Sequence, residues 1–144
     1  TQQSTIQEAI NILQSRLQQT EIMKSSSEVR AFCQLKLGEQ KDEHFGCLFL
    51  NTRHCLITFE TLFKGTIDSA SVYPRVVVRR ALELNAAAII FTHNHPSGDA
   101  TPSSSDVAIT KRLVEALNLI DIRVLDHVVV GKSGSTSMAE SGLI

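Results

Sequence analysis

The sequence is organised around the stretch FTHNHPSGDATPSSSD, residues 91–106. It begins at the end of an apolar run, Ala86 to Phe91, which is typical of a strand buried on both of its faces. His93 and His95 follow two residues apart, and in an extended chain this spacing points both imidazoles to the same side. The next four residues, Pro-Ser-Gly-Asp, are turn formers, so the chain is expected to reverse directly after the second histidine.

A helix is predicted after this turn, with Thr101 as its N-cap and Pro102 at its first helical position. Ten residues separate His95 from Asp106, which falls in the first turns of that helix. Two imidazoles at a strand end and one carboxylate at the start of the next helix can therefore meet at one point. Three protein ligands with one open position are typical of a catalytic zinc site, whereas structural zinc sites have four.

Asp106 is predicted to point inward, because it lies three residues before the first apolar residue of a helical stripe. An inward carboxylate needs a partner, since an isolated buried charge is very costly. An alternative assigns Asp106 to the helix start, because Ser103-x-x-Asp106 also fits the capping-box pattern. The two histidines just upstream favour the ligand interpretation. The apolar stripe consists of Ile109, Leu113, Ala116, Leu117 and Ile120.

Length and composition are ordinary for a globular protein. The chain has 144 residues, of which 42% are hydrophobic and 20% charged, and its formal net charge is −1. We therefore expect one domain over residues 1–144, with a helical N-terminal extension over residues 1–24 and a core over residues 25–144. The lack of a basic excess argues against nucleic acid as a partner of the isolated domain. No apolar run approaches the ~18 residues of a membrane span.

The three cysteines, Cys33, Cys47 and Cys55, are an odd number and have no CxxC spacing. We interpret them as reduced residues, mostly in the core, and not as a second metal site. Reduced thiols and the lack of a recognisable signal peptide predict a cytoplasmic location.

The N-terminal part of the chain predicts two helices. In the first, apolar residues recur at helical spacing behind a cap at Ser4 or Thr5. The second begins at Ser25, runs to about Leu37 and ends at Gly38 as its C-cap. The apolar positions of the first helix are Ile6, Ile10, Leu13 and Leu17.

The rest of the chain alternates strands and helices. Two strand-like runs, residues 45–50 and 55–63, are separated by a short connection typical of a hairpin. A helix over residues 73–84 leads into the apolar run before His93, and residues 122–130 predict a further buried strand. The order ααββαβαβ indicates an α/β (α+β) fold in which helices flank a mixed central sheet.

The histidine motif carries a resemblance to a known family. The letters HNHP at residues 93–96, followed by S-x-x-D at residues 103–106, resemble the JAMM (MPN+) metalloprotease motif. The segments KGTIDSASVYPR, LNAAAIIFTHNHPSGDATPSSSDVAIT and VLDHVVVG are similar to the bacterial RadC family. This second resemblance runs from about Ser25 to the end of the chain.

The resemblance implies a fold and a set of site residues. The fold would be a cytidine-deaminase-like JAB/MPN core, and one zinc ion would be held by His93, His95 and Asp106. Glu43 corresponds to the family glutamate that polarises the zinc-bound water. Ser103 matches the family serine that helps to stabilise the tetrahedral intermediate.

Apart from the resemblance, a hydrolytic zinc site needs a nearby carboxylate that takes a proton from water and returns it to the leaving nitrogen. Glu43 is the candidate for this role, and Glu60 is its rival. His127 lies in the last buried strand, so we expect it to be satisfied in the core or to contact a ligand, and not to be a fourth ligand. His44 and His54 are expected at the surface.

Other zinc enzymes fit less well, because a zinc deaminase needs HxE and PCxxC and Ser97 occupies the aspartate position of an HxHxDH motif. The sequence therefore predicts a zinc-dependent hydrolase of peptide or isopeptide bonds that acts on a peptide or protein substrate. The alternative is a zinc-containing, DNA-repair-associated binding module of the RadC type without protease turnover. The sequence predicts no membrane partner, does not identify the substrate, and is compatible with a homodimer.

Overall fold

The structure, a computed structural model, describes residues 1–67 and 71–144. Within these ranges, five strands form one mixed sheet in the order β2-β1-β3-β4-β5. Strand β1 is antiparallel to both β2 and β3, β3 and β4 are parallel, and β5 is antiparallel to β4. The predicted mixed sheet is thus confirmed. The strands are β1 (His44–Leu50), β2 (Leu56–Lys64), β3 (Ala88–Asn94), β4 (Arg123–Val130) and β5 (Ser135–Ser137).

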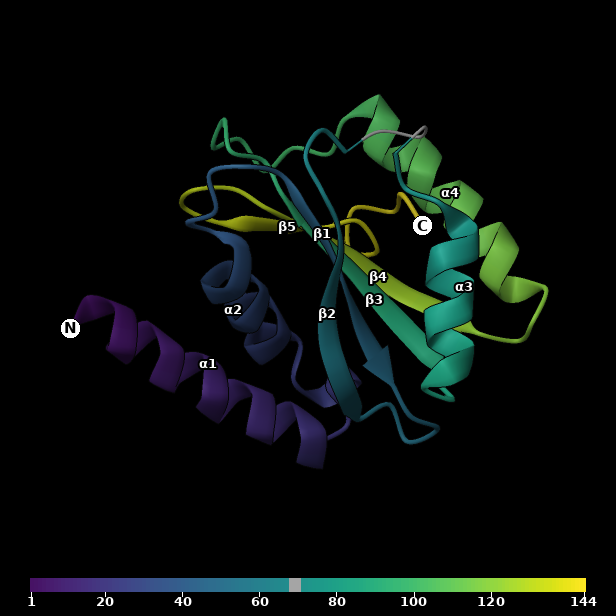
Figure 1. The fold of residues 1–144 in the computed structure, drawn as a ribbon, viewed down its shortest axis with the longest axis horizontal. Coiled ribbons are helices and arrows are strands. Elements are labelled where there is room, and N and C mark those ends of the chain that lie inside the picture. Colours follow the sequence, from purple (N-terminus) through teal and green to yellow (C-terminus); the bar gives the residue numbers. More distant parts are fainter. Residues whose placement is uncertain (68–70) are drawn as a thin grey trace.

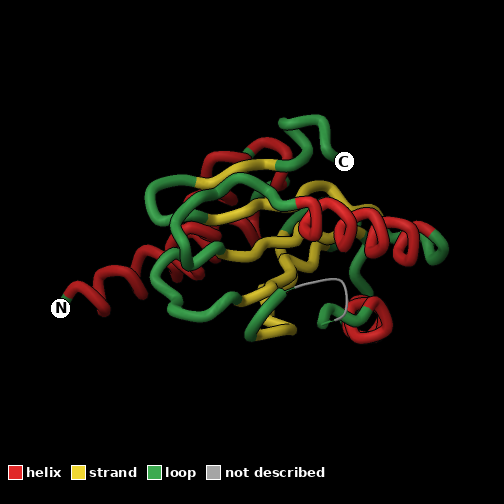
Figure 2. Tube along the Cα trace, turned by 90° about the horizontal axis from the view of Figure 1, so that it is seen from above, coloured by secondary structure: helices red, strands yellow, loops and turns green. Residues whose placement is uncertain are grey.

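Helices cover both faces of this sheet (Figure 1). One pair, drawn in purple and blue, lies on one side, and the other pair, in teal and green, lies on the opposite side. Seen from above, the first helix extends toward the N-terminus beyond the strands (Figure 2). Among the described residues, no helix has the length and apolar character needed to cross a membrane. The helices are α1 (Gln2–Gln19), α2 (Ser26–Leu37), α3 (Pro74–Glu83), α4 (Ser104–Asn118) and the short 3₁₀ helix η1 (Ile22–Lys24).

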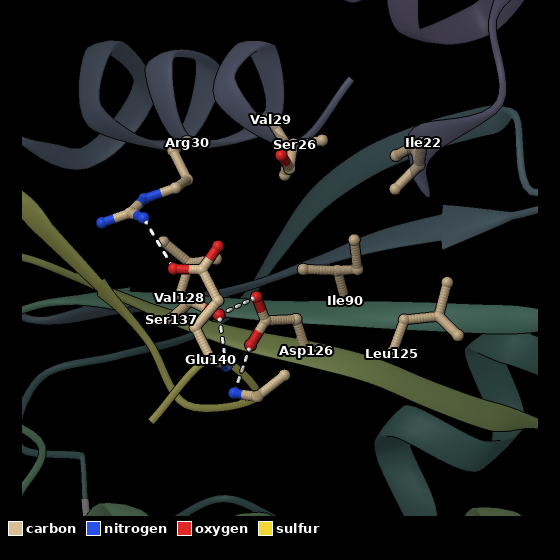
Figure 3. A pocket seen from close by; sticks show the side chains of 11 residues that line it. Ile22, Ser26, Val29, Arg30, Ile90, Leu125, Asp126, Val128, Ser137 and Glu140 are labelled. Carbon is tan, nitrogen blue, oxygen red and sulfur yellow. Dashed lines mark hydrogen bonds and ion pairs between the residues drawn. The ribbon is translucent and has the colours of Figure 1, made fainter. Parts of the chain in front are cut away.

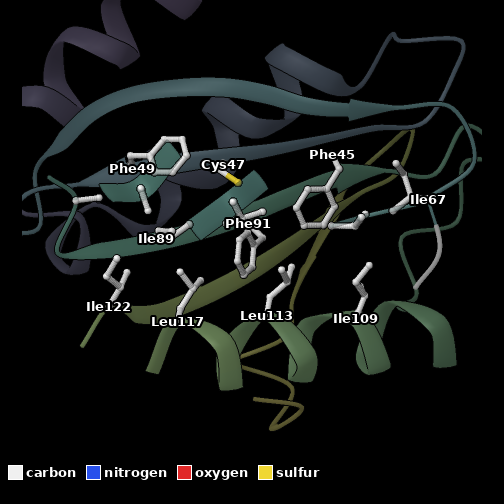
Figure 4. Packing of buried hydrophobic residues seen from close by; sticks show 14 residues of the cluster. Phe45, Cys47, Phe49, Ile67, Ile89, Phe91, Ile109, Leu113, Leu117 and Ile122 are labelled. Carbon is white, nitrogen blue, oxygen red and sulfur yellow. The ribbon is translucent and has the colours of Figure 1, made fainter. Parts of the chain in front are cut away.

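The central strand β3 is buried along its whole length, as its apolar sequence predicts. Its alternating side chains enter two separate cores, so Ile89 and Phe91 face α3 and α4 while Ile90 faces α1 and α2. Figure 4 shows Leu113 of α4 pointing toward this strand. Each fully buried side chain of this size contributes roughly 1.5–3 kcal/mol, so β3 is held firmly from both sides.

All three cysteines are free thiols, as the sequence predicted. Cys33 and Cys47 are buried in the two cores, and Cys55 is half-buried. Burial raises the pKa of the Cys33 thiol to about 12, so this group stays protonated and acts as apolar filling.

The connection from β3 through α4 to β4 determines where the site forms. Because β3 and β4 are parallel, α4 crosses over between them and starts just beyond the end of β3. The end of a strand and the start of a helix therefore meet at the carboxyl edge of the sheet, which is where open α/β sheets bind ligands.

Two predicted helix starts were wrong. The N-cap of α4 is Ser103, not Thr101, because the Asp99 carboxylate accepts hydrogen bonds from both the Thr101 amide and its hydroxyl and so keeps Thr101 in the turn. The cap of α1 is Thr1, whose hydroxyl accepts from the Ser4 amide, so this helix begins earlier than a cap at Ser4 or Thr5 allows. In both cases a side chain near the helix start accepts a hydrogen bond from a backbone amide, and this contact fixes where the helix begins.

Candidate metal centre

Strand β3 carries the first histidine. The strand continues three residues past Phe91 and ends at Asn94, so His93 lies inside it and His95 follows directly. The His95 amide donates to the Val130 carbonyl at 2.8 Å, which keeps this residue aligned with β4. Both imidazoles therefore point to the same side, as the spacing predicted, and their Nε2 atoms lie 3.0 Å apart. The His93 side chain is fully buried, whereas that of His95 is 17% exposed.

The turn after β3 orients the second imidazole. Gly98 has a φ of 101°, a conformation that L side chains rarely adopt, and its amide donates to the His95 carbonyl at 2.9 Å. The turn brings the Asp99 carbonyl oxygen to 2.8 Å from Nδ1 of His95. Because a carbonyl can only accept, Nδ1 of His95 carries the proton, and in the neutral ring Nε2 presents a lone pair to the site.

Asp106 occupies the third position of α4 and performs two tasks. Its Oδ2 accepts from the Ser103 amide at 2.7 Å, and its amide donates to Oγ of Ser103 at 3.0 Å, so the capping box is present. The same carboxylate is 3.0 Å from Nε2 of His93 through Oδ1 and 3.0 Å from Nε2 of His95 through Oδ2. The cap and the histidine cluster are therefore compatible, and the capping box aims the carboxylate.

Asp106 is ionised in this environment. Burial by itself would raise its pKa, but the close contacts with the imidazoles of His93 and His95 outweigh that effect and hold the pKa of Asp106 well below its usual value. The same carboxylate raises the pKa of His95. An ionised carboxylate that faces two imidazole nitrogens is a suitable donor for a cation.

His93, His95 and Asp106 could hold a metal ion, because each offers one donor atom to a common point. A tetrahedral ion with bonds of about 2.0–2.1 Å keeps its donors roughly 3.3 Å apart, which is close to the 3.0 Å separations seen here. Among the described residues, His44, His54 and His127 are not part of this cluster. His44 and His54 were predicted at the surface, and both are half-buried, so each is partly exposed there.

Glu43 lies beside this cluster. It is the last residue before β1, it is half-buried, and its Oε2 accepts from the Ile67 amide at 3.3 Å. It shares an open hollow of about 440 Å³ with His95, Ser103 and Asp106. Glu43 thus lies in the hollow that opens beside the cluster.

Glu60, the rival carboxylate, has a different environment. Its two oxygens accept from Nε and from a terminal nitrogen of Arg80, each at 2.7 Å. These hydrogen bonds lower the pKa of Glu60. It is not among the described residues that line the hollow at the cluster, whereas Glu43 is one of them.

Asn94 holds the segment that carries Glu43, a role that the sequence did not reveal. Its side chain is buried on the face of β3 opposite the two histidines, as expected from the alternation. Its Oδ1 accepts from the His44 amide at 2.7 Å, and its Nδ2 donates to the Asp42 carbonyl at 3.1 Å. Asn94 therefore fixes the backbone on both sides of Glu43.

We expect Asn94→Ala to lower the free energy of unfolding by about 1–3 kcal/mol, because it leaves partly buried backbone groups without their side-chain partner. Urea unfolding of the metal-free protein measures this loss. Asn118→Ala is the matched control, since Asn118 is exposed at the end of α4 and such changes stay within about 0.5 kcal/mol. Equal losses in the two variants would contradict the role of Asn94.

A second, smaller cavity of about 160 Å³ lies on the other face of the sheet, between α2 and β4 (Figure 3). Its charged groups are already paired, since Arg30 binds Glu140 at 3.1 Å and Asp126 accepts from the Ser137 hydroxyl at 2.6 Å. These contacts attach the C-terminal segment to α2 and β4. These charged groups therefore stabilise the fold by holding the C-terminal segment in place.

Comparison with known sequences agrees with this geometry. The model of the RadC-like JAB domain family matches residues 23–143. A UPF0758 protein of Marinobacter nauticus is 50% identical over 142 residues, which are 99% of this chain and 63% of that protein. A UPF0758 protein of Vibrio cholerae is 53% identical over 137 residues, or 95% of this chain and 86% of that protein. The chain spans about three fifths of the length of the first of these relatives.

Proposed function

The chain belongs to the RadC-like JAB domain family, and from this premise we propose that it is a zinc-dependent hydrolase of peptide or isopeptide bonds. One observation carries the proposal. A largely buried donor set of two imidazoles and a carboxylate opens onto a hollow that also contains a separate carboxylate and a hydroxyl. This combination supplies the groups that metal-assisted hydrolysis of an amide requires. The residues are His93, His95, Asp106, Glu43 and Ser103.

The donor set supports zinc over other common ions. Imidazole nitrogen and carboxylate oxygen are ordinary zinc ligands, and three protein ligands with one open position are typical of catalytic zinc sites. Magnesium and calcium prefer sites built from oxygen atoms alone. Two of the three donor atoms in this cluster are nitrogen, so these two ions are disfavoured.

The protein residues have distinct roles in the proposed reaction. When bound, zinc would polarise the scissile carbonyl and make water acidic enough to attack it near neutral pH. The Glu43 carboxylate takes the proton from the attacking water and returns it to the leaving nitrogen. Oγ of Ser103 accepts from the Asp106 amide, and its own proton has no acceptor among the described residues. That proton can be donated to the oxygen on which negative charge develops.

Zinc content provides the first test. Protein purified without chelator is expected to contain about one zinc ion per chain, because the cluster forms one site. Elemental analysis measures the ratio. A ratio near zero that added zinc does not restore would contradict the proposed site.

Hydrolysis provides the second test. We expect new N-termini or released isopeptide-linked fragments when a bacterial protein extract is treated with the zinc-loaded chain, and none with the metal-stripped chain. Mass spectrometry identifies these products. Full zinc occupancy without any cleavage would favour the alternative function, a zinc-containing binding module without turnover.

A further inference from the structure

A chain of buried hydrogen bonds extends behind the cluster, on the side away from the open hollow. Nδ1 of His93 lies 2.7 Å from Nε2 of His127, and Nδ1 of His127 lies 2.6 Å from the Thr110 hydroxyl. That hydroxyl donates to the Asp106 carbonyl at 2.7 Å. This series of hydrogen bonds therefore begins at the backbone of Asp106 and ends at the imidazole of His93, and both residues belong to the candidate metal cluster.

The position of each proton in this chain follows from one contact. Two oxygens 2.7 Å apart need a proton between them, and the Asp106 carbonyl has none, so Thr110 donates its only hydroxyl proton there. The Thr110 oxygen can then only accept from His127, so Nδ1 of His127 carries the ring proton.

The same logic continues to His93. A neutral His127 with its proton on Nδ1 offers a lone pair at Nε2, so the 2.7 Å contact requires a proton from Nδ1 of His93. In neutral His93 the lone pair then lies on Nε2, the atom that faces Asp106 and His95. The hydrogen bonds alone thus orient His93 for metal binding.

The surroundings preserve this arrangement. His127 and Thr110 are both fully buried. The rings of Phe45 and Phe91 pack edge-on against His127, at centroid distances of 5.5 Å and 5.9 Å. An apolar enclosure of this kind makes an unpaired N–H costly, so the ring cannot exchange its partners for water.

We propose that Thr110 and His127 are positioning residues that fix the tautomer and the orientation of His93 for the metal. The inference rests on the metal site of the proposed function and does not depend on hydrolysis. Metal-binding histidines usually donate their second N–H to a carboxylate, a carbonyl or water. Here a neutral histidine accepts instead, and the Thr110 hydroxyl is needed to set its direction.

Zinc affinity of the full chain provides the test. Thr110→Val has the same shape but lacks the hydroxyl, so it leaves Nδ1–H of His127 without an acceptor whenever His93 binds metal. We expect zinc to bind about 10–100-fold more weakly, the usual cost of losing an outer partner of a metal ligand. Thr110→Ser restores the hydroxyl and should recover wild-type affinity. Competition with a zinc chelator measures all three affinities.

The outcomes separate this inference from the proposed function. If the wild-type chain does not bind zinc, the metal site itself is overturned and the inference with it. If the wild-type chain binds zinc and Thr110→Val binds equally well, only the positioning role is overturned. Equal weakening by Thr110→Val and Thr110→Ser would also overturn it, because Ser keeps the hydroxyl, and the hydroxyl would then not account for the loss of affinity.

A measurement on the wild-type chain guards against a variant that does not fold. In the zinc-loaded protein, ¹⁵N NMR of the imidazoles should show His127 as a neutral ring with its proton on Nδ1. A proton on Nε2 of His127 would overturn the inference. This measurement shows which nitrogen of His127 carries the proton and therefore the direction of each hydrogen bond. If Thr110 and His127 only filled space in the core, no particular direction would be required.

Discussion

Replacing Asp106 by Asn is expected to abolish the stabilisation of this protein by zinc while leaving the metal-free chain folded. The carboxylate is the one anionic donor of the cluster and lies 3.0 Å from Nε2 of both histidines. Losing an outer partner of a metal ligand costs about 10–100-fold in affinity, so the loss of a ligand should exceed that range. The carbonyl oxygen of Asn can still accept from the Ser103 amide, which keeps the start of α4 intact.

Thermal melting with and without zinc measures this effect. At free zinc about 100 times the dissociation constant, binding adds roughly 2.7 kcal/mol of stability. That gain corresponds to a rise in Tm of roughly 5–11 °C for a chain near 150 residues. The wild-type protein should show this rise, and Asp106→Asn should show little or none.

Ser103→Ala is the matched control. It removes the hydroxyl that caps α4 but leaves the Asp106 carboxylate in place. The loss of a cap costs about 0.5–2 kcal/mol, and this cost should appear equally with and without zinc. If Asp106→Asn instead kept the full zinc-induced rise, Asp106 would be a cap and not a ligand.

Replacing Glu43 by Gln is expected to lower the rate of hydrolysis about 10²–10⁴-fold, the usual contribution of a general acid–base group. Gln has nearly the same size and can still accept from the Ile67 amide, as Glu43 does at 3.3 Å. It cannot take a proton from water near neutral pH. Zinc content should stay unchanged, because the cluster of donor atoms does not include Glu43.

Glu60→Gln provides the comparison for this experiment. Glu60 is bound by Arg80 on another part of the surface, so its replacement should leave hydrolysis nearly unchanged. Both variants are assayed on the cleavage products found with the wild-type chain, and their zinc content is measured in parallel. Loss of zinc from Glu43→Gln would make Glu43 a ligand. Loss of activity only in Glu60→Gln would transfer the role of base to that residue.

Much of the fold was predictable because it depends on local patterns. The apolar run of β3, the stripe of α4 and the hairpin of β1 and β2 all appear at the predicted places. The exact helix starts were less predictable, since Thr101 and Ser103 are both good N-caps. The Asp99 side chain decided between them, because it binds Thr101 in the turn.

By itself, the sequence determined which three side chains could form the metal cluster. The two-residue spacing of His93 and His95 sets their common side in a strand, and the Ser103-x-x-Asp106 spacing aims the carboxylate at the start of a helix. These are short-range geometries that hardly depend on the rest of the chain. The three residues of the cluster could therefore be predicted from the sequence alone.

Only the tertiary structure decided what surrounds the cluster. Asn94 reaches the backbone next to Glu43 across 50 residues of sequence, and His127 reaches His93 across 34. Such contacts depend on which strands are neighbours and on how α4 crosses over between them. The spacing of residues along the sequence does not show this packing, because the residues in contact belong to different helices and strands. The position of Glu43 beside the cluster, the pairing of Glu60 with Arg80 and the hydrogen bonds through Thr110 thus follow from how the strands and helices pack together.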